Sequence, residues 1–404
     1  MSKETFKRRA FIGLVSKTTV IGLATSPLSS LAIYTEHKKP NADHVFLTKP
    51  YLQNPGPDVI TIMWITARNA YSWVEYQTEA GDIIKNHAVT DGMVDANNQI
   101  HRIALQDLKP GTRYSYTAFS KEIVDYQPYQ ITYGTTISSE KYEFITPVLN
   151  AKSMAMLIIN DIHDRPNSIP HLMTLNGNDP FDFVFFNGDM FNFQKDQQQI
   201  IQNMLNPCTD TFASTKPFMY IRGNHETRGK FARQLPTYFN NINGTQYFSF
   251  SRGPVHFIAL DTGEDKEDEA PVYAGLIDFD AYRKKQAVWL EQQLQSNAYK
   301  KAIFKVVLMH IPHYHSGDWH GTMHCREVFG PLFNKYKIDL MISGHTHKYG
   351  IHKAQEGHDF PIVIGGGPQD GKRTLIKLKA NERSLHLSMI KDDGQEVGTY
   401  EIKR

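Results

Sequence analysis

A set of short apolar runs after residue 153 each end in side chains that can bind a metal ion or transfer a proton. In chain order these side chains are Asp161, His163, Asp189, Asn224, His225, His310, His345 and His347. Carboxylates, imidazoles and one amide oxygen, without a thiolate, are ligands typical of iron, manganese or zinc. The set exceeds what one ion needs, so it predicts two metal ions about 3.5–4 Å apart that share a carboxylate. Such a pair binds a phosphate and lowers the pKa of a bridging water.

The runs that carry these residues have the length and composition of strands buried on both faces. They are MAMLIIN, FVFFN, FMYIR, KVVLMH and IDLMIS, and longer polar or helical segments separate them. We expect a helix over residues 280–296, where apolar residues recur three and four positions apart. Buried strands interleaved with helices indicate an α/β layered domain, in which ligands bind at the carboxyl ends of the strands. The last thirty residues predict three short strands that close one sheet edge.

Residues 45–147 follow another pattern, in which many short alternating runs are separated by turn residues such as PGPD and KPGT. This pattern predicts a β-sandwich. The stretch LKPGTRYSYTAF resembles the tyrosine-bearing turn of fibronectin type III-like domains. No cluster with ligand-like spacing occurs in this region, so we expect a structural or substrate-framing module. The polar residues 33–44 before it are predicted to be a linker.

Residues 1–32 have the layout of a secretory signal, in which basic residues precede an apolar stretch and small residues. The pair Arg8-Arg9 followed by AFI resembles the twin-arginine export signal, and residues 30–32 offer a cleavage site. This resemblance implies export of cofactor-loaded protein, to a periplasmic or extracellular location. An ordinary basic tail is the alternative interpretation.

The composition of the chain argues against several classes of protein. The 404 residues are 40% apolar and carry a formal net charge of +2, which indicates neither a nucleic-acid-binding nor a membrane-surface protein. No long uncharged apolar stretch predicts a membrane span after the N-terminal segment. Cys208 and Cys325 are too few for a disulfide scaffold, and either a pair or two buried thiols is compatible with the sequence.

The ordered motifs DIH, GD, GNHE, VLMH and GHTH resemble those of the calcineurin-like metallophosphoesterase superfamily over residues 152–372. The resemblance implies an α-β-β-α layered domain at residues 150–404, with closing strands at 373–404. The β-sandwich in front of it resembles the N-terminal domain of purple acid phosphatases. Carried over by motif, the resemblance implies a first metal at Asp161, His163 and His347, a second at Asn224, His310 and His345, and Asp189 as the bridge. It also implies that His225 contacts the phosphate and protonates the leaving oxygen as a general acid.

The motifs also depart from the relatives. Purple acid phosphatases lack the histidine at His163 and bind iron through a tyrosine where this chain has Asn192, so we expect no tyrosinate colour. Calcineurin-type phosphatases carry an aspartate at that position which orients the catalytic histidine. What orients His225 is therefore open, and Glu226 is adjacent only in sequence. Asp164 replaces a glycine common in the superfamily, without an evident reason.

The histidine-rich segment HIPHYHSGDWHGTMH follows the fourth motif and is expected to pass near the metals. His313 and His315 are candidate phosphate contacts, because a protonated imidazole pairs well with an anion. A polar surface loop is the alternative interpretation of these two residues.

Together these features predict an exported dinuclear-metal phosphoesterase that hydrolyses phosphate monoesters of small molecules. In this reading a metal-bridged hydroxide attacks and His225 is the general acid. A phosphodiesterase with the same site is one alternative, because both reactions need the same groups. A non-catalytic binding protein that uses the β-sandwich is the other. A long nucleic acid is not expected as a partner, because no basic face is visible in the composition.

Overall fold

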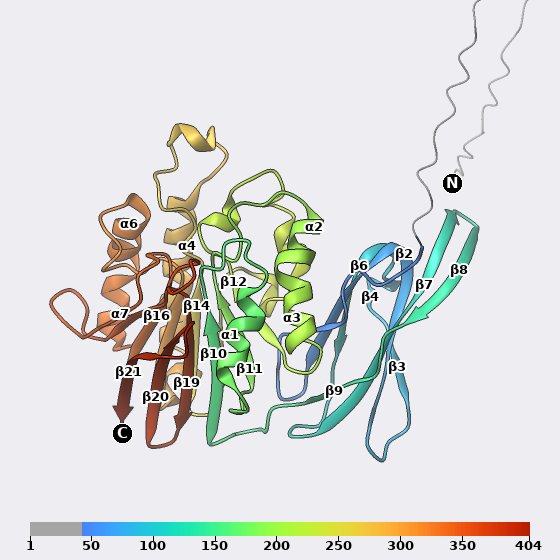
Figure 1. Cartoon of the computed structure of the whole chain (residues 1–404), viewed down its shortest axis with the longest axis horizontal. Helices are drawn as coiled ribbons and strands as arrows, with labels where there is room; N and C mark the ends of the chain where they lie inside the picture. Colours follow the sequence, from blue (N-terminus) through green and yellow to red (C-terminus); the bar gives the residue numbers. More distant parts are fainter. Residues whose placement is uncertain (1–42) are drawn as a thin grey trace, which may run out of the picture. The chain divides into compact units, whose positions relative to one another are not determined.

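The structure, a computed structural model, describes residues 43–404 (Figure 1). The predicted export signal at residues 1–32, and nearly all of the predicted linker at 33–44, lie outside the described residues. Within residues 43–404, no helix is both long enough and apolar enough to cross a membrane.

The N-terminal β-rich region is built around one long strand, β2 (Ile60–Thr78), which continues through two runs that the sequence separates. Its partners are β1 (Tyr51–Gln53), β3 (Ile84–Asn86), β6 (Ala96–Leu105) and β7 (Arg113–Gln127). The first half of β2 pairs mainly with β6 and the second half with β7. Register shifts between Ile65 and Tyr71 allow this change of partner. The strand thus reaches both layers of the predicted β-sandwich, around a core that contains Trp64 and Tyr116.

Two smaller strand pairs complete this region. A hairpin joins β7 to β8 (Gln130–Ser138), and β9 (Tyr142–Ile145) lies against the start of β7. β4 (Val89–Thr90) and β5 (Met93–Val94) form a separate two-stranded ribbon. β1 pairs in parallel with β12 through Gln53 and Phe218, so the hydrogen-bonded sheet continues into the α/β part of the chain. The predicted boundary near residues 147–150 therefore stays a prediction.

The α/β part contains two sheets. The first consists of β10 (Ser153–Ile159), β11 (Phe183–Asn187) and β12 (Phe218–Ile221) in parallel, followed at the β10 edge by antiparallel β19 (Thr374–Asn381), β20 (Ser384–Lys391) and β21 (Glu396–Lys403). The second has the order β13 (Phe248–Arg252), β14 (Val255–Leu260), β15 (Phe304–Met309), β16 (Leu340–Ser343), β18 (Ile362–Ile364) and β17 (Gly350–His352). The three C-terminal strands close a sheet edge, as the sequence predicts.

Alternate residues of the strands show how the layers arise. Met156 and Ile158 of β10 join a core that also contains Val306 and Leu308 of β15, so the two sheets pack against each other. The residues between them point outward into helix-covered cores. Helices α1 (Ser168–Asn176), α2 (Gln197–Ile200), a helical segment Ile201–Leu205 and α3 (Asn206–Thr211) cover the first sheet. Helices α4 (Phe279–Leu294), α5 (Asn297–Lys301), α6 (His320–Val328) and α7 (Gly330–Tyr336) cover the second.

This arrangement is the expected α-β-β-α layering, and burial on both faces explains why the central strands are mainly apolar. The predicted helix at 280–296 is α4. Cys208 and Cys325 are free buried thiols that lie in different cores, so of the two alternatives the structure supports two buried thiols.

Candidate metal centre

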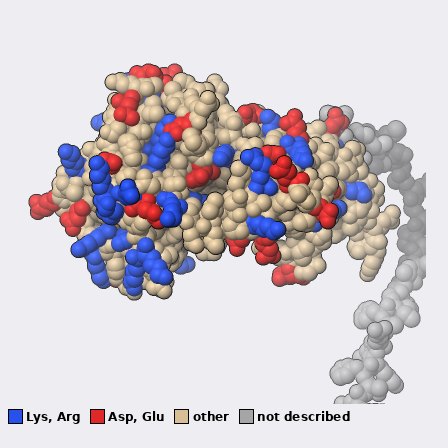
Figure 2. Space-filling view, turned by 90° about the horizontal axis from the view of Figure 1, so that it is seen from below, with Lys and Arg blue, Asp and Glu red and all other residues tan. Residues whose placement is uncertain are grey.

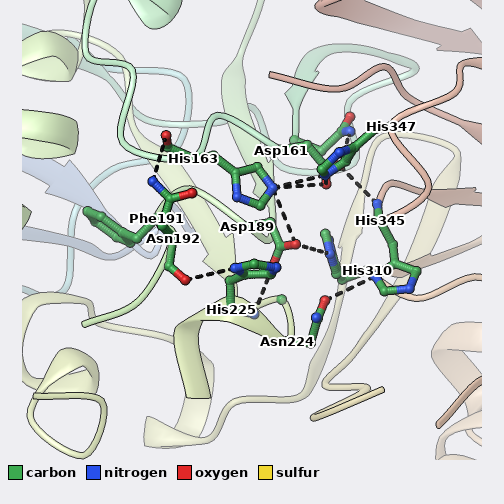
Figure 3. Close-up of polar contacts among 12 residues, drawn as sticks. Asp161, His163, Asp189, Phe191, Asn192, Asn224, His225, His310, His345 and His347 are labelled. Carbon is green, nitrogen blue, oxygen red and sulfur yellow. Dashed lines mark hydrogen bonds and ion pairs between the residues drawn. The ribbon is translucent and has the colours of Figure 1, made fainter. Parts of the chain in front are cut away.

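The ends of β10, β11 and β12 from one sheet meet those of β15 and β16 from the other. At that meeting point the structure brings together all seven predicted ligands (Figure 3), which are Asp161, His163, Asp189, Asn224, His310, His345 and His347. The ligand atoms of Asp161, His163, Asp189 and His347 lie within 4.8 Å of one another. Those of Asp189, His310 and His345 form a second such group, which Asn224 joins through a 3.0 Å contact between its Oδ1 and Nδ1 of His345. Asp189 belongs to both groups.

The backbone turns sharply where these side chains leave the strands. Asp161, His163, Asp189, His345 and His347 all have left-handed φ angles, of 52°, 49°, 55°, 72° and 57°. Non-glycine residues rarely adopt this conformation, which costs about 1–3 kcal/mol and collects at functional sites. The strained turns bring these side chains together at the ends of the two sheets.

The glycines of the motifs make room for the same carboxylates. A Cβ atom on Gly344 would collide with the carboxylate of Asp161, and one on Gly223 would collide with that of Asp189. The GHTH and GNHE motifs therefore begin with glycine because the neighbouring loops approach too closely for any side chain.

The donor atoms are arranged for cations that bind between them. Oδ1 of Asp161 and Nε2 of His310 are buried and make no hydrogen bond. Nε2 of His163 and Nε2 of His347 lie 3.0 Å apart, and the latter is 3.2 Å from Oδ1 of Asp161. Buried polar atoms normally have partners, and two imidazole nitrogens that face each other cannot satisfy the carboxylate as well without a shared cation. The residues therefore fit two metal ions.

The electrostatics of the cluster agree with this fit. Burial by itself would raise the pKa of Asp161, but cationic His310 and the nearby imidazoles of His163 and His347 outweigh it and lower the pKa below its ordinary value. Burial would lower the pKa of His310, but Asp189 and Asp161 outweigh it and raise the pKa to about 10. Burial and the nearby His310 lower the pKa of His345 to about 4. The site therefore favours positive charge beside its two carboxylates.

Glu226 has a role that sequence reasoning missed. Its Oε2 accepts hydrogen bonds from the backbone N–H of Asp189 at 2.9 Å and of Gly223 at 2.7 Å. Its Oε1 accepts from the N–H of Met190 at 2.6 Å and of Phe191 at 3.3 Å. Burial and the charge of Asp189 raise the pKa of Glu226 to about 7. This carboxylate joins the loops after β11 and β12 and is not the group that orients His225.

A backbone carbonyl orients His225. Nδ1 of His225 lies 2.7 Å from the carbonyl oxygen of Asn192, and Nη1 of Arg228 lies 3.1 Å from its Nε2. A carbonyl only accepts and a guanidinium only donates, so the imidazole here is neutral with its proton on Nδ1. Burial, followed by the positive charge of Arg228, lowers the pKa of His225 against the opposing effect of Asp189. The open question about this histidine is thus answered by geometry that no local motif contains.

Asp164 explains why the Asn192 carbonyl is in that place. Its Oδ2 accepts hydrogen bonds from the backbone N–H and the Nδ2 of Asn192, at 2.9 and 3.0 Å. Its Oδ1 accepts from Gln199 at 2.8 Å and from Asn203 at 2.9 Å. The aspartate that replaces the common glycine therefore joins the loop after β10 to the loop after β11, whose Asn192 carbonyl contacts His225.

A pocket of about 430 Å³ opens onto the ligand cluster. His225, Asp265, His315, Trp319 and Lys348 line it together with ligand residues. His315 has a left-handed φ of 67°, and its ring stacks on His352 with centroids 3.8 Å apart. The structure thus places His315 in the wall of this pocket.

His313 is placed differently. Its side chain is 0% exposed, its ring stacks on Phe360, and neither ring nitrogen has a hydrogen-bond partner. This burial contradicts the predicted contact of His313 with substrate, because the ring faces the core beneath α7.

Comparisons with known proteins agree with the fold and the motifs. Residues 154–349 match the family model described as calcineurin-like phosphoesterase. The chain is similar to probable purple acid phosphatase 20 of Arabidopsis thaliana, with 24% identity over 396 residues that cover 89% of this chain and 83% of the relative. It is also similar to acid phosphatase type 7 of Mus musculus, with 26% identity over 327 residues that cover 74% and 68%.

Two solved structures show the same fold over most of the chain. One is the purple acid phosphatase PPD1 from yellow lupin seeds, with a TM-score of 0.65, 20% identity, and coverage of 88% of this chain and 74% of that one. The other is a structure of PhoD, with a TM-score of 0.62, 12% identity, and coverage of 91% and 90%. The likeness therefore includes the N-terminal β-rich region as well as the α/β part.

Proposed function

Because the chain belongs to the calcineurin-like metallophosphoesterase superfamily and is a metal-dependent phosphoesterase, we propose that it hydrolyses phosphate monoesters of small molecules. Two metal ions of iron, manganese or zinc are its cofactors. The observation that carries the proposal is the pair of ligand groups that share Asp189, next to a pocket that His225 lines. The relatives named purple acid phosphatase and acid phosphatase favour a monoester over a diester.

We assign the first metal to Asp161, His163 and His347, the second to Asn224, His310 and His345, and the bridging position to Asp189. When bound, the two ions would supply positive charge for the phosphate and lower the pKa of the attacking water. Neutral imidazoles and ionised carboxylates are the forms that bind metal, so His310, whose pKa is raised to about 10, would release its proton when an ion binds. Glu226 contributes indirectly, since it holds the backbone of the bridging residue.

We assign the role of general acid to His225. The carbonyl of Asn192 fixes the Nδ1–H edge of the ring, so Nε2 is the atom that can carry and release a proton. Arg228 donates to Nε2 in the structure, so protonated His225 must release that contact. A phosphate dianion in the pocket favours the protonated form by attraction, and Nε2–H then donates to the leaving oxygen.

The first test is the metal content of the purified protein, measured together with hydrolysis of 4-nitrophenyl phosphate and of bis(4-nitrophenyl) phosphate. About two equivalents of metal and faster hydrolysis of the monoester are expected. A preference for the diester would establish the phosphodiesterase alternative. No hydrolysis of either ester after reconstitution with metal would refute the proposal and favour the binding-protein alternative.

The His225 assignment has a separate test in His225→Ala, with His386→Ala on the exposed face of β20 as the matched control. With an alkyl phosphate, whose leaving oxygen needs a proton, His225→Ala is expected to lower turnover by about 10²–10⁴, the usual contribution of a general acid, with unchanged metal content. Equal loss of metal and of turnover would mean that His225 is a ligand.

The surface supports a small substrate rather than a long nucleic acid. Figure 2 shows lysine and arginine side chains gathered toward one end of the face in view, with acidic side chains among them. Several cations are already paired, such as Lys377 and Lys379 with Asp179 and Arg404 with Asp339. Pairing of this kind leaves less charge for phosphates of a nucleic-acid backbone.

We also propose that the protein is exported through the twin-arginine route to the periplasm or the cell exterior. The Arg8-Arg9 pair and the apolar stretch after it support this proposal. Replacement of both arginines by lysine is expected to retain the full-length chain inside the cell, as measured by fractionation and immunoblotting. Unchanged export of the variant would refute the twin-arginine route.

A further inference from the structure

A third cluster of metal-binding side chains lies outside the catalytic groups, between α4 and α6. Asp280 is in the first turn of α4, and His320 and His324 are one turn apart at the start of α6. The candidate ligand atoms of these three residues all lie within 4.8 Å of one another. We propose that this cluster binds a zinc ion that joins α4 to α6.

The helix geometry brings both imidazoles to one place. Residues four apart share a helix face, and the two rings are stacked with centroids 5.8 Å apart at 23°. Nε2 of His320 lies 2.9 Å from each carboxylate oxygen of Asp280, and Nδ1 of His324 lies 3.0 Å from Oδ1. Both rings therefore direct a nitrogen at the same carboxylate.

Hydrogen bonding does not account for His324. This residue is 6% exposed, and its Nδ1 makes no hydrogen bond although the carboxylate oxygen is only 3.0 Å away. His310 in the catalytic cluster has the same signature, with a buried Nε2 that lacks a hydrogen bond 3.0 Å from Oδ2 of Asp189. A buried nitrogen close to an oxygen at an unsuitable angle is what a shared metal ion explains.

The positive charge of Arg283 beside this cluster is compatible with a bound cation. Nη1 of Arg283 lies 3.0 Å from Oδ1 of Asp280, but the same guanidinium also donates to the carbonyl oxygens of Thr262 and Glu264. Arg283 is thus fixed from the protein side and orients the carboxylate, the arrangement expected of a group behind a metal ligand. Because the charge of Arg283 repels a cation, we expect this site to bind zinc with lower affinity than the catalytic pair does.

The ligand set selects the kind of ion. Two imidazoles and one carboxylate without a thiolate suit zinc, with solvent in the fourth position of a tetrahedron. The side chain of His320 is 35% exposed, so an ion can reach the cluster from solvent. Zinc here would fix the start of α6 directly after Trp319, which lines the catalytic pocket.

The test compares the zinc content of variants with that of the wild-type protein. His320→Gln and His324→Gln are made together with the control His386→Gln, and each protein is stripped, reloaded with zinc, desalted and measured by plasma mass spectrometry. Each site variant is expected to hold about one equivalent less than the wild type and the control. Zinc content equal to the wild type in both variants overturns the proposal.

Two further measurements keep the result independent of folding and of the catalytic site. In wild-type protein, a zinc titration is expected to saturate about one equivalent higher than in His324→Gln, and equal saturation of the two proteins overturns the proposal. Asp189→Asn is expected to lose catalytic metal and hydrolysis but to retain the ion at Asp280. The zinc site at Asp280 can therefore be tested by metal content alone, even if the protein proves not to be a phosphoesterase.

Discussion

Replacing Asp164 by asparagine tests whether the loop that presents the Asn192 carbonyl positions His225. Asp164 accepts four hydrogen bonds, two from Asn192 and one each from Gln199 and Asn203. An asparagine of the same shape keeps one acceptor oxygen and turns an amide group toward two of these donors. A hydrogen bond to a charged group contributes about 1.5–3 kcal/mol, and partial exposure of the loop favours the lower end. We therefore expect a loop destabilised by about 2 kcal/mol.

This loss predicts a rate effect that depends on the leaving group. If it appears entirely in the placement of His225, about 2 kcal/mol corresponds to about 30-fold in rate. The effect is expected in full for an alkyl phosphate, whose leaving oxygen needs a proton. For 4-nitrophenyl phosphate, whose leaving group departs as an anion, we expect less than about threefold.

The assay is kcat for both substrates, with metal content measured on the same samples. Asp182→Asn is the matched control, because that carboxylate also accepts a backbone hydrogen bond, from Ala155 at 2.9 Å, but lies outside the catalytic cluster. His225→Ala is the reference and is expected to show the same substrate dependence with a larger loss. An equal loss on both substrates, or a loss of metal, would refute the positioning role of Asp164.

Three further predictions concern stability and spectra. Burial lowers the pKa of His313 from 6.5 to about 3, so the folded state resists protonation and stability falls as pH drops below 6.5. His313→Phe should remove roughly 2 kcal/mol of this loss at pH 5, and urea unfolding at pH 7 and pH 5 would measure it. Glu226→Gln places an amide against backbone N–H groups and should lower the free energy of unfolding by about 2–4 kcal/mol. The metal content measured by plasma mass spectrometry should fall as well. An unchanged melting temperature would contradict this prediction. The iron-loaded protein should lack a tyrosinate absorption band because Asn192 replaces tyrosine, and a strong visible band would contradict that assignment.

The cluster of seven candidate ligands could be predicted from the sequence, because local features place each of these residues at the end of a strand. An apolar run of strand length followed by glycine and a carboxylate or imidazole predicts both the strand and the place where its side chain emerges. The ends of buried strands collect at one edge of an α/β layer, so residue type and position together indicate the cluster. The α-β-β-α layers follow for the same reason, since burial on both faces of a strand is visible in its composition.

The partners of the site residues depend on how loops from different strands meet. Asp164 is 28 positions from Asn192, and no local pattern shows that its carboxylate holds the loop whose carbonyl orients His225. The same holds for His313, which lies two residues before a pocket residue and yet faces a core.

The strands, the layered fold and the candidate metal ligands could thus be inferred from local patterns, because strand periodicity and residue chemistry are local. Three contacts become visible only in the folded chain: Glu226 with the backbone of Asp189, the Asn192 carbonyl with His225, and Asp280 with His320 and His324. Those contacts join segments that are distant in the chain, and their geometry is set by how the two sheets and their helices pack. Local sequence patterns therefore identify the chemical groups of the site, whereas the packing of the sheets and helices determines which groups contact each other.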